Sequence, residues 1–318
     1  MRIGRDEWKK WCSNIGDLPI TCDPDWASSL EDGYGGKFKA DALLVTYEDD
    51  EELLAIYKDN CRPLARLHLS PFGLYCGIAR RSGAPRYQET LATFFRSYAK
   101  RYRSAHYCLP FYGSGGVAQP ESQDRLEDYS THVLDLNSTY EDIFENRFKG
   151  ATRTCIRRAE SSDVSVTITR EQEHVQRYYE IHRRLAVDKG GYGELHPLRM
   201  LIEMVNRCSR CELAVAWSGS QIVAGGIFFA DGPSAFYWHG AIDRNFTSLQ
   251  PNYALLSVMI KRAIASGKRY FNFGGSAGIE SLEAFKESWG ATRRSYQVGH
   301  VTNPLAASVR TLKKFFQG

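Results

Sequence analysis

Apolar residues recur along the chain in two patterns, and together these predict the same order of elements in each half. Alternating or continuous apolar runs, separated by acidic residues, proline or glycine, predict strands. In the first half these runs lie at 40–48, 53–59, 64–70 and 73–79. A helical pattern at about 86–103 and a buried strand at 105–113 follow them.

A predicted strand at 130–136 precedes the second half. Apolar residues spaced three and four apart then predict helices at about 140–160 and 171–187. Three strands joined by turns follow as an antiparallel meander: CELAVAWSGS, QIVAGGIFFADG and SAFYWHGAID. The remaining expected elements are a helix at 253–265, a strand at 268–274, a helix at 278–289, a strand at 293–300 and a helix at 305–316.

This order is typical of acyltransferase folds of the GNAT type, and most of it can be found twice. We therefore predict an α/β (α+β) protein with two tandem GNAT-like domains, each a mixed sheet flanked by helices. The first domain is expected at 1–140 and the second at 141–302.

Composition places the chain among ordinary globular proteins. Of its 318 residues, 43% are hydrophobic and 25% are charged, which excludes a disordered protein. The N-terminus lacks the apolar core of a signal peptide, and no run is long enough to span a membrane, so we expect a cytoplasmic protein. The one CxxC, Cys208–Cys211, has no partner pair at zinc-ligand spacing; we expect reduced, structural cysteines and no metal.

The net charge of +4 is the sum of two unlike halves. Residues 1–146 contain 17 basic and 23 acidic side chains, whereas residues 147–318 contain 24 and 14. The first half thus has a net charge of −6 and the second of +10. We expect the second half to meet an anionic molecule.

A cluster of basic residues lies in the first predicted helix of the second half. Lys149, Arg153 and Arg157 are four residues apart and share one stripe, with Arg147 and Arg158 beside them. The stripe either forms salt bridges to the acidic first domain or binds phosphates.

Two further features lie near the end of the chain. The sequence FNFGGSAG (271–278) leads from a strand through glycines, including Gly274 and Gly275, into a helix; it is either a tight turn or a cradle for an anion. In the helix that follows, we expect Ile279, Leu282, Phe285 and Trp289 to form an apolar face. Lys286 sits at the edge of that face, where its ammonium either reaches solvent or lies inside a cleft.

YWHG (237–240) ends a predicted strand. His239 is either a packed strand residue or a general base. Trp238 precedes it, and strand alternation predicts that Trp238 faces the other way.

These segments resemble the FemABX family of aminoacyl-tRNA-dependent peptidyltransferases. The matching pieces run in order from about Ser70 to about Tyr296: SPFGLYCG, YSTHVLDL, FKGATRTCIRRAESSDVSV, ELAVAWSGSQIVAGGIFF, FYWHGAID, LQPNYALLSVMIKRAIASGKRYFNFGG and AFKESWGA. The resemblance implies two GNAT-like domains, with the C-terminal helix at 303–318 returning to the first. The segment at 188–197 is too short for the coiled-coil arm of some members, so the chain is similar to the armless ones.

For function, the resemblance implies transfer of an amino acid from aminoacyl-tRNA to the amine of a peptide acceptor, with the charged tRNA as co-substrate and no cofactor. Phe285 and Lys286 match the family's Phe–Lys pair, whose lysine is implicated near the tRNA 3′ end. Lys149, Arg153 and Arg157 become candidate tRNA contacts. We expect Lys286 to be catalytic, with His239 as the second candidate, in a monomeric protein.

The family's clamp for the diphosphate of a UDP-linked cell-wall precursor is altered here. Its first basic residue falls at 28–30, which contains none, and its second falls at His196. We therefore expect a peptide natural product, such as an antibiotic, as acceptor in preference to UDP-MurNAc-pentapeptide. The substrate-binding candidates are His196, Trp238, Asn252, Gly274, Gly275 and Phe285. The alternative is a CoA-dependent GNAT N-acyltransferase, but RNFTSLQPN (244–252) lacks the glycines of a CoA-binding turn.

Overall fold

The computed structural model describes residues 1–318 except 49, 60–64, 99–103, 114–124, 189–194 and 303–318. The chain divides into two compact units. The first comprises the described residues of Met1–Tyr129 and Ser295–Gly318, and the second comprises those of Ser130–Arg294. The helix expected at 303–318 lies outside the described residues.

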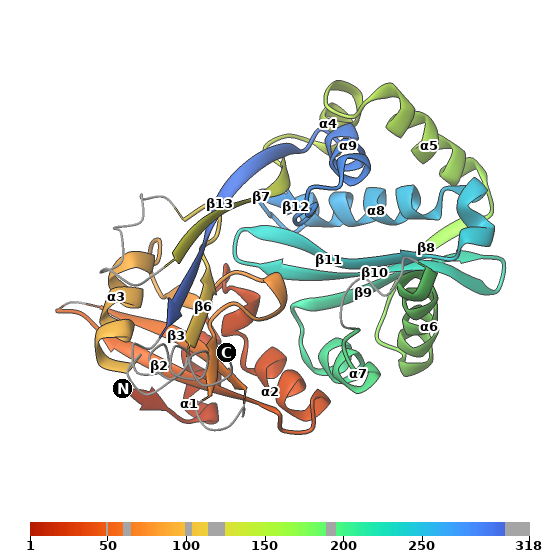
Figure 1. The fold of residues 1–318 in the computed structure, drawn as a ribbon. Coiled ribbons are helices and arrows are strands. Elements are labelled where there is room, and N and C mark those ends of the chain that lie inside the picture. Colours follow the sequence, from red (N-terminus) through yellow and green to blue (C-terminus); the bar gives the residue numbers. More distant parts are fainter. Residues whose placement is uncertain (49, 60–64, 99–103, 114–124, 189–194, 303–318) are drawn as a thin grey trace, which may run out of the picture. The chain divides into compact units, whose positions relative to one another are not determined.

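In the first unit the strands follow the order β1, β2, β3, β4, β6, β13, with β5 paired to β3 (Figure 1). Its elements are β1 (Arg2–Ile3), α1 (Arg5–Cys12), η1 (Ile20–Cys22), α2 (Pro24–Gly33), β2 (Phe38–Thr46), β3 (Glu51–Asp59), β4 (Arg66–His68), η2 (Pro71–Gly73), β5 (Ile78–Arg80), α3 (Tyr87–Tyr98), β6 (Ser104–Cys108) and the end of β13 (Thr292–Thr302). Leu91 and Phe94 of α3 pack with Leu67 and Tyr107 of the sheet in a buried core. Trp26 of α2 packs edge-on against Tyr57.

In the second unit the order is β7, β12, β11, β10, β9, β8. Its elements are the end of β7 (Arg125–Asp135), α4 (Tyr140–Asn146), α5 (Gly150–Ser161), β8 (Val164–Thr169), α6 (Gln172–Asp188), α7 (Leu198–Arg207), β9 (Cys211–Ser218), β10 (Gln221–Asp231), β11 (Ser234–Ile242), η4 (Arg244–Leu249), α8 (Pro251–Ala265), β12 (Tyr270–Asn272), α9 (Glu280–Ser288) and the start of β13. Helices α8 and α9 lie on one face of this sheet, and α6 and α7 lie on the other (Figure 1).

The predicted duplication is confirmed by the strand pairing. In each unit four strands pair antiparallel in sequence order, the fourth pairs parallel with the next, and an antiparallel strand closes the sheet. The parallel pairs are β4 with β6 and β11 with β12. The closing strands are β13 for the first unit and β7 for the second. The segment between Asp188 and Leu198 is too short for a coiled-coil arm, as predicted.

Some predicted elements were wrong in extent. The helix expected at 140–160 is broken: Lys149 is extended, and its N–H donates to Ser288 O at 2.9 Å while Phe148 packs edge-on against Trp289 at 5.0 Å. The strand expected at 73–79 is reduced to β5, because Phe72 and Gly73 have positive φ. The pattern also missed β8 and α7.

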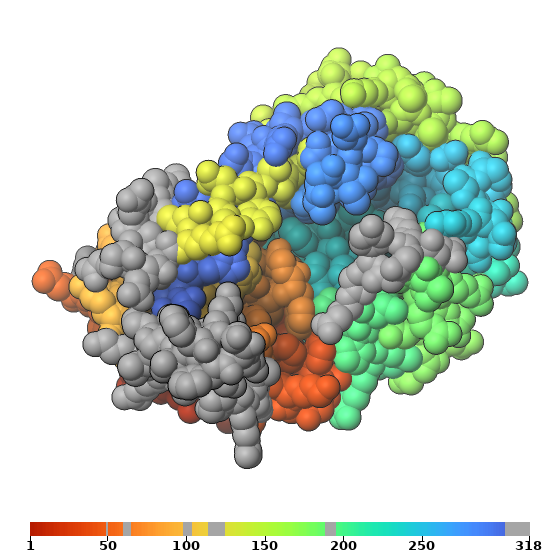
Figure 2. Space-filling view, in the orientation of Figure 1, coloured from red at the N-terminus to blue at the C-terminus, as the bar shows by residue number. Residues whose placement is uncertain are grey.

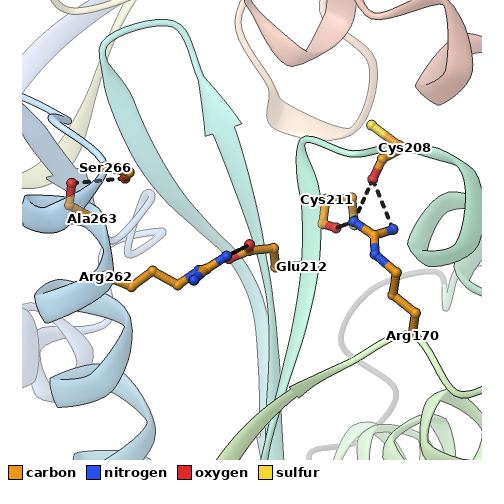
Figure 3. Close-up of polar contacts among 7 residues, drawn as sticks. All are labelled: Arg170, Cys208, Cys211, Glu212, Arg262, Ala263 and Ser266. Carbon is orange, nitrogen blue, oxygen red and sulfur yellow. Dashed lines mark hydrogen bonds and ion pairs between the residues drawn. The ribbon is translucent and has the colours of Figure 1, made fainter.

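Two arginines tie the layers of the second unit together (Figure 3). Arg262 of α8 donates to both carboxylate oxygens of Glu212 on β9 from its Nε, at 3.0 and 2.8 Å. Arg170 donates to the carbonyl oxygens of Cys208 and Cys211 at 3.4–3.5 Å. The two cysteines of the CxxC segment are thus buried at the ends of the turn between α7 and β9, and their carbonyl oxygens accept these hydrogen bonds.

Candidate functional site

Lys286 is buried at the end of the parallel pair β11–β12. Its side chain comes from α9, and the residue is only 4% exposed. The ammonium donates to the carbonyl oxygens of Gly274 and Gly275, at 2.8 and 2.7 Å. A buried charge needs such partners, because a desolvated ammonium without them costs several kcal/mol. The sequence left open whether this ammonium reaches solvent or is enclosed, and in the structure it is enclosed.

Burial lowers the pKa of Lys286 to about 8, and the Glu283 carboxylate opposes that shift. The side chain is therefore mostly protonated at neutral pH, yet close enough to its pKa to lose the proton in mildly alkaline solution. Shifts of this size are common at functional sites.

The turn that holds Lys286 is shaped by the residues before it. Asn272 Oδ1 accepts the N–H of Gly274 at 2.9 Å and the hydroxyl of Thr131 at 2.5 Å. Gly274 has a φ of +75°, in the left-handed region that favours glycine. The carbonyl oxygens of Gly274 and Gly275 accept hydrogen bonds from the Lys286 ammonium, so this part of the turn binds a cation. The sequence had left two alternatives for it, a tight turn or a binding site for an anion.

Sequence reasoning missed His132, which lies beside this turn. His132 is on β7 and shares the face of Leu134, which packs in the core under α8 and α9. Its Nδ1 lies 3.4 Å from Ser276 Oγ, and the residue is 1% exposed. Its Nε2 is buried and has no hydrogen-bond partner among the described residues. A histidine inside the apolar strand STHVLDL was the available signal.

His239 faces the other side of the sheet. Its ring lies 5.2 Å from that of His182 on α6 and 5.1 Å from that of His196. The expectation that Trp238 faces away from it was wrong, because the two rings stack at 3.9 Å. The register of β10 and β11 shifts here: Tyr237 pairs with Phe228 and His239 with Ile227. Trp238 is the extra residue of a β-bulge.

We call His182, His196, His239 and Trp238 the histidine cluster. Burial lowers the pKa of His196 to about 4 and that of His239 well below its ordinary value, and neighbouring histidines lower both further. Burial also lowers the pKa of His182. The cluster is therefore a set of neutral, stacked aromatic rings at neutral pH. It suits the binding of a flat or apolar group better than that of an anion.

The other predicted site residues lie around α8 and α9. Phe285 packs edge-on against Tyr253 at 5.7 Å and is half-buried in the core. Asn252 lies in the first turn of α8. The structure thus groups Phe285, Lys286 and the two glycines on the α8–α9 side. Trp238, His239 and His196 form the separate histidine cluster.

Helix α5, whose residues include most of the basic stripe, lies on an outer surface of the second unit (Figure 2). Arg153 donates to the carbonyl oxygens of Glu145 and Phe148 at 2.9 and 2.7 Å, and Arg157 pairs with the Glu145 carboxylate at 3.3 Å. These partners belong to the second unit, not to the first domain expected at 1–140. Lys149 is exposed.

A separate hollow of about 560 Å³ lies at the far end of α8. Its lining includes Lys261, Arg262 and Lys268. Arg262 is bound to Glu212, Lys261 lies 3.7 Å from Glu160, and Lys268 donates to Gly232 O at 2.6 Å. Each of these three cationic side chains is therefore paired with a group of the protein itself.

The residues that the structure describes contain neither a metal-binding cluster nor a membrane-spanning helix. No group of three or more histidine, cysteine, aspartate or glutamate side chains there is arranged to hold a metal ion. In the same ranges, none of the helices has the length and apolar character needed to cross a bilayer.

Comparisons with known proteins agree with this architecture. A family model described as an acetyltransferase (GNAT) domain matches residues 146–287, which lie in the second unit. A search of curated proteins gave no match.

Among solved structures, FemX is similar with a TM-score of 0.69 at 13% identity, covering 97% of this chain and 98% of that one. The C-terminal domain of a putative lysylphosphatidylglycerol synthetase from Agrobacterium fabrum has a TM-score of 0.59 at 12% identity, covering 97% and 95%. A tandem GNAT protein from the clavulanic acid biosynthesis pathway has a TM-score of 0.53 at 11% identity, covering 95% and 98%. The chain therefore has a tandem GNAT fold, and its second unit is similar in sequence to acetyltransferase (GNAT) domains.

Proposed function

We propose that the protein is an aminoacyltransferase that moves an amino acid from aminoacyl-tRNA to the amine of a peptide acceptor. The observation behind this proposal is the buried Lys286 ammonium beside Phe285 at the end of the parallel strands. The FemX-like fold supports it, as does the sequence resemblance to the FemABX family. The charged tRNA is the co-substrate, and no cofactor is needed.

Aminoacyl transfer from charged tRNA does not require a strong nucleophile from the protein. An aminoacyl ester is already activated, and an α-amine with a pKa of about 8 is partly neutral at pH 7. The site must align the two reactants and stabilise the negative charge that develops on the carbonyl oxygen. Lys286 has three N–H donors and uses two on the turn carbonyls, so the ammonium supplies positive charge in a desolvated place.

For the acceptor we propose a peptide natural product with a free amine. The rings of the histidine cluster, with His196 at the position of the family's second clamp arginine, favour an uncharged group over a diphosphate. We further propose that the protein acts as a cytoplasmic monomer, because aminoacyl-tRNA is made in the cytoplasm.

The alternative donor is an acyl-CoA, which the match to an acetyltransferase (GNAT) domain favours. Anions at a helix start are bound by free backbone N–H groups. Here α8 begins with Pro251, which has no N–H, after Gln250 at a φ of +59°. This start offers one donor fewer to a pyrophosphate, so we rank the CoA donor second.

The test offers the full chain a pool of radiolabelled aminoacyl-tRNAs with trialanine as the peptide amine. We expect transfer to trialanine to exceed the protein-free rate by about ten-fold or more, and charged tRNA to raise the Tm more than deacylated tRNA. Equal stabilisation by both tRNAs without transfer would indicate an inactive RNA-binding protein. Acetyl transfer from acetyl-CoA to trialanine, without aminoacyl transfer, would establish the alternative.

A further inference from the structure

The turn after β12 is held at two consecutive places by side chains from the same face of the sheet. Lys286 donates to the carbonyl oxygens of Gly274 and Gly275. The next residue, Ser276, has its hydroxyl 3.4 Å from His132 Nδ1. The backbone N–H of His132 also donates to Gly274 O, at 3.3 Å. The imidazole therefore fixes the end of the segment that presents the two carbonyl oxygens to Lys286.

The surroundings of His132 Nε2 favour the neutral imidazole. This atom is buried without a hydrogen-bond partner among the described residues. A neutral ring that keeps its one hydrogen on Nδ1 leaves only a lone pair at Nε2. A protonated ring has a hydrogen on both nitrogens, and an N–H buried without an acceptor costs about 1–3 kcal/mol.

Charged side chains act on the ring from α9 and from the start of β13. Burial is the largest cause that lowers the pKa of His132, and the Lys286 ammonium is the next. Arg293 lowers this pKa too, whereas the carboxylates of Glu283 and Glu287 raise it. Protonation would thus set a second positive charge near Lys286.

We infer that His132 is a positioning residue for Lys286: its neutral imidazole anchors Ser276 so that the carbonyl oxygens of Gly274 and Gly275 hold the ammonium in place. The inference rests on the proposed function, in which Lys286 is the cationic group of the site. It follows that protonation of His132 loosens the turn and ends activity on the acid side.

Two substitutions of His132 distinguish the loss of its contact with Ser276 from the loss of its protonation. His132→Asn keeps a polar atom near the Nδ1 position and cannot titrate, so we expect kcat at pH 7.5 within about three-fold of wild type and no fall in rate on the acid side. His132→Leu removes the anchor, and we expect kcat to fall about 10–100-fold with KM little changed. An unchanged acid limb in His132→Asn, or full activity in His132→Leu, would overturn the inference.

The second unit provides a matched control. His174 Nδ1 lies 2.8 Å from Thr169 Oγ1, so it forms the same kind of imidazole–hydroxyl pair away from the turn. We expect His174→Asn to keep both the basal rate and the acid limb of wild type. Loss of the acid limb in this variant would assign it to another group and overturn the inference.

A second measurement does not depend on catalysis. In NMR titrations of histidine-labelled protein, we expect the pKa of His132 to lie below 6.5 and to rise in Lys286→Met by about half a unit or more, because a nearby positive charge has been removed. An unchanged pKa would show that the two side chains are not coupled. If the coupling is found but the wild type transfers no amino acid, the proposed function fails while the contact with the turn stands.

Discussion

Lys286 and His239 lie on opposite faces of the sheet of the second unit. Lys286 reaches the turn after β12 from α9, on the side of α8, whereas the His239 ring packs against His182 of α6. The sequence had named both as catalytic candidates. Their surroundings differ: the Lys286 ammonium is bound by the turn carbonyl oxygens, whereas His239 belongs to a neutral aromatic cluster.

We first predict that Lys286→Met lowers kcat with charged tRNA by about 10²–10³-fold, the usual cost of losing one charge-stabilising group. The folded protein should survive, because Met also removes a desolvated charge; circular dichroism and Tm measure this. The ammonium is protonated below its pKa of about 8, so the wild-type rate should fall as the pH rises above that value. Near-normal turnover of folded Lys286→Met would refute the assignment.

Our second prediction concerns Trp238. Its ring lies 4.8 Å from that of His196 and 3.9 Å from that of His239, so it stacks on two of the three histidines of the cluster. If the cluster binds a group of one substrate, Trp238→Ala should raise the KM for that substrate about ten-fold and leave kcat within about three-fold of wild type. Steady-state kinetics with each substrate varied measures this. A lower kcat at unchanged KM would contradict it.

The repeated order of strands and helices could be predicted because both units bury amphipathic elements with clear periods. The face of α9 could not. Ile279 and Leu282 were expected on its apolar face but are 53% and 36% exposed, while Lys286 is buried. A helical pattern ranks residues only by hydrophobicity. It contains no information on the carbonyl oxygens of Gly274 and Gly275, which accept hydrogen bonds from the Lys286 ammonium and so allow its burial.

Two other parts of the site were beyond the pattern for similar reasons. Ser276 and His132 are 144 residues apart in the chain, so their contact exists only after β7 and β12 have paired. The bulge at Trp238 breaks the period of two on which alternation depends. Tyr237 lies so close to Gly240 that an added Cβ there would be 1.5 Å from its hydroxyl.

Our third prediction assigns different roles to the residues of the basic stripe: a structural one to Arg153, and tRNA contacts to Lys149 and Arg157. Arg153 donates to two carbonyl oxygens, one in the last turn of α4 and one just after it, so Arg153→Ala should lower the free energy of unfolding by about 1–2 kcal/mol. The pair Lys149→Ala and Arg157→Ala removes the exposed ion pair of Arg157 with Glu145, so the free energy of unfolding should change by less than about 1 kcal/mol. If these two contact tRNA phosphates, the double variant should bind tRNA more weakly, with a salt dependence smaller by about two charges. Filter binding at several salt concentrations measures this, and an unchanged slope would exclude the contact.

Our fourth prediction concerns Gly290, which follows α9. Its φ is +72°, and an added Cβ would lie 2.7 Å from Arg147 Cβ and 2.8 Å from Arg147 O. Gly290→Ala should therefore lower the free energy of unfolding by roughly 2–4 kcal/mol, through backbone strain and the clash together. Gly267 is the matched control, because its φ of +71° is similar but nothing lies within 4 Å of the added Cβ. Gly267→Ala should cost only about 1 kcal/mol. Equal losses in urea unfolding would contradict the packing argument.

Our last prediction is that acid destabilises the second unit through His196. Burial lowers its pKa in the folded chain to about 4, with His182 as the second cause, whereas the unfolded chain has the ordinary value of 6.5. Between these values the unfolded chain binds the proton more readily, so stability falls as the pH decreases from 6.5 toward 4.

At pH 5 such a shift corresponds to a loss of up to about 2 kcal/mol. His196→Asn cannot titrate, so the difference in unfolding free energy between pH 7.5 and pH 5 should shrink by up to that amount. His174→Asn serves as the control, since His174 lies in the first turn of α6 and contacts Thr169 and Trp217, outside the histidine cluster. Urea unfolding at both pH values measures the difference. An unchanged difference in His196→Asn would show that the ring is not held neutral by its burial.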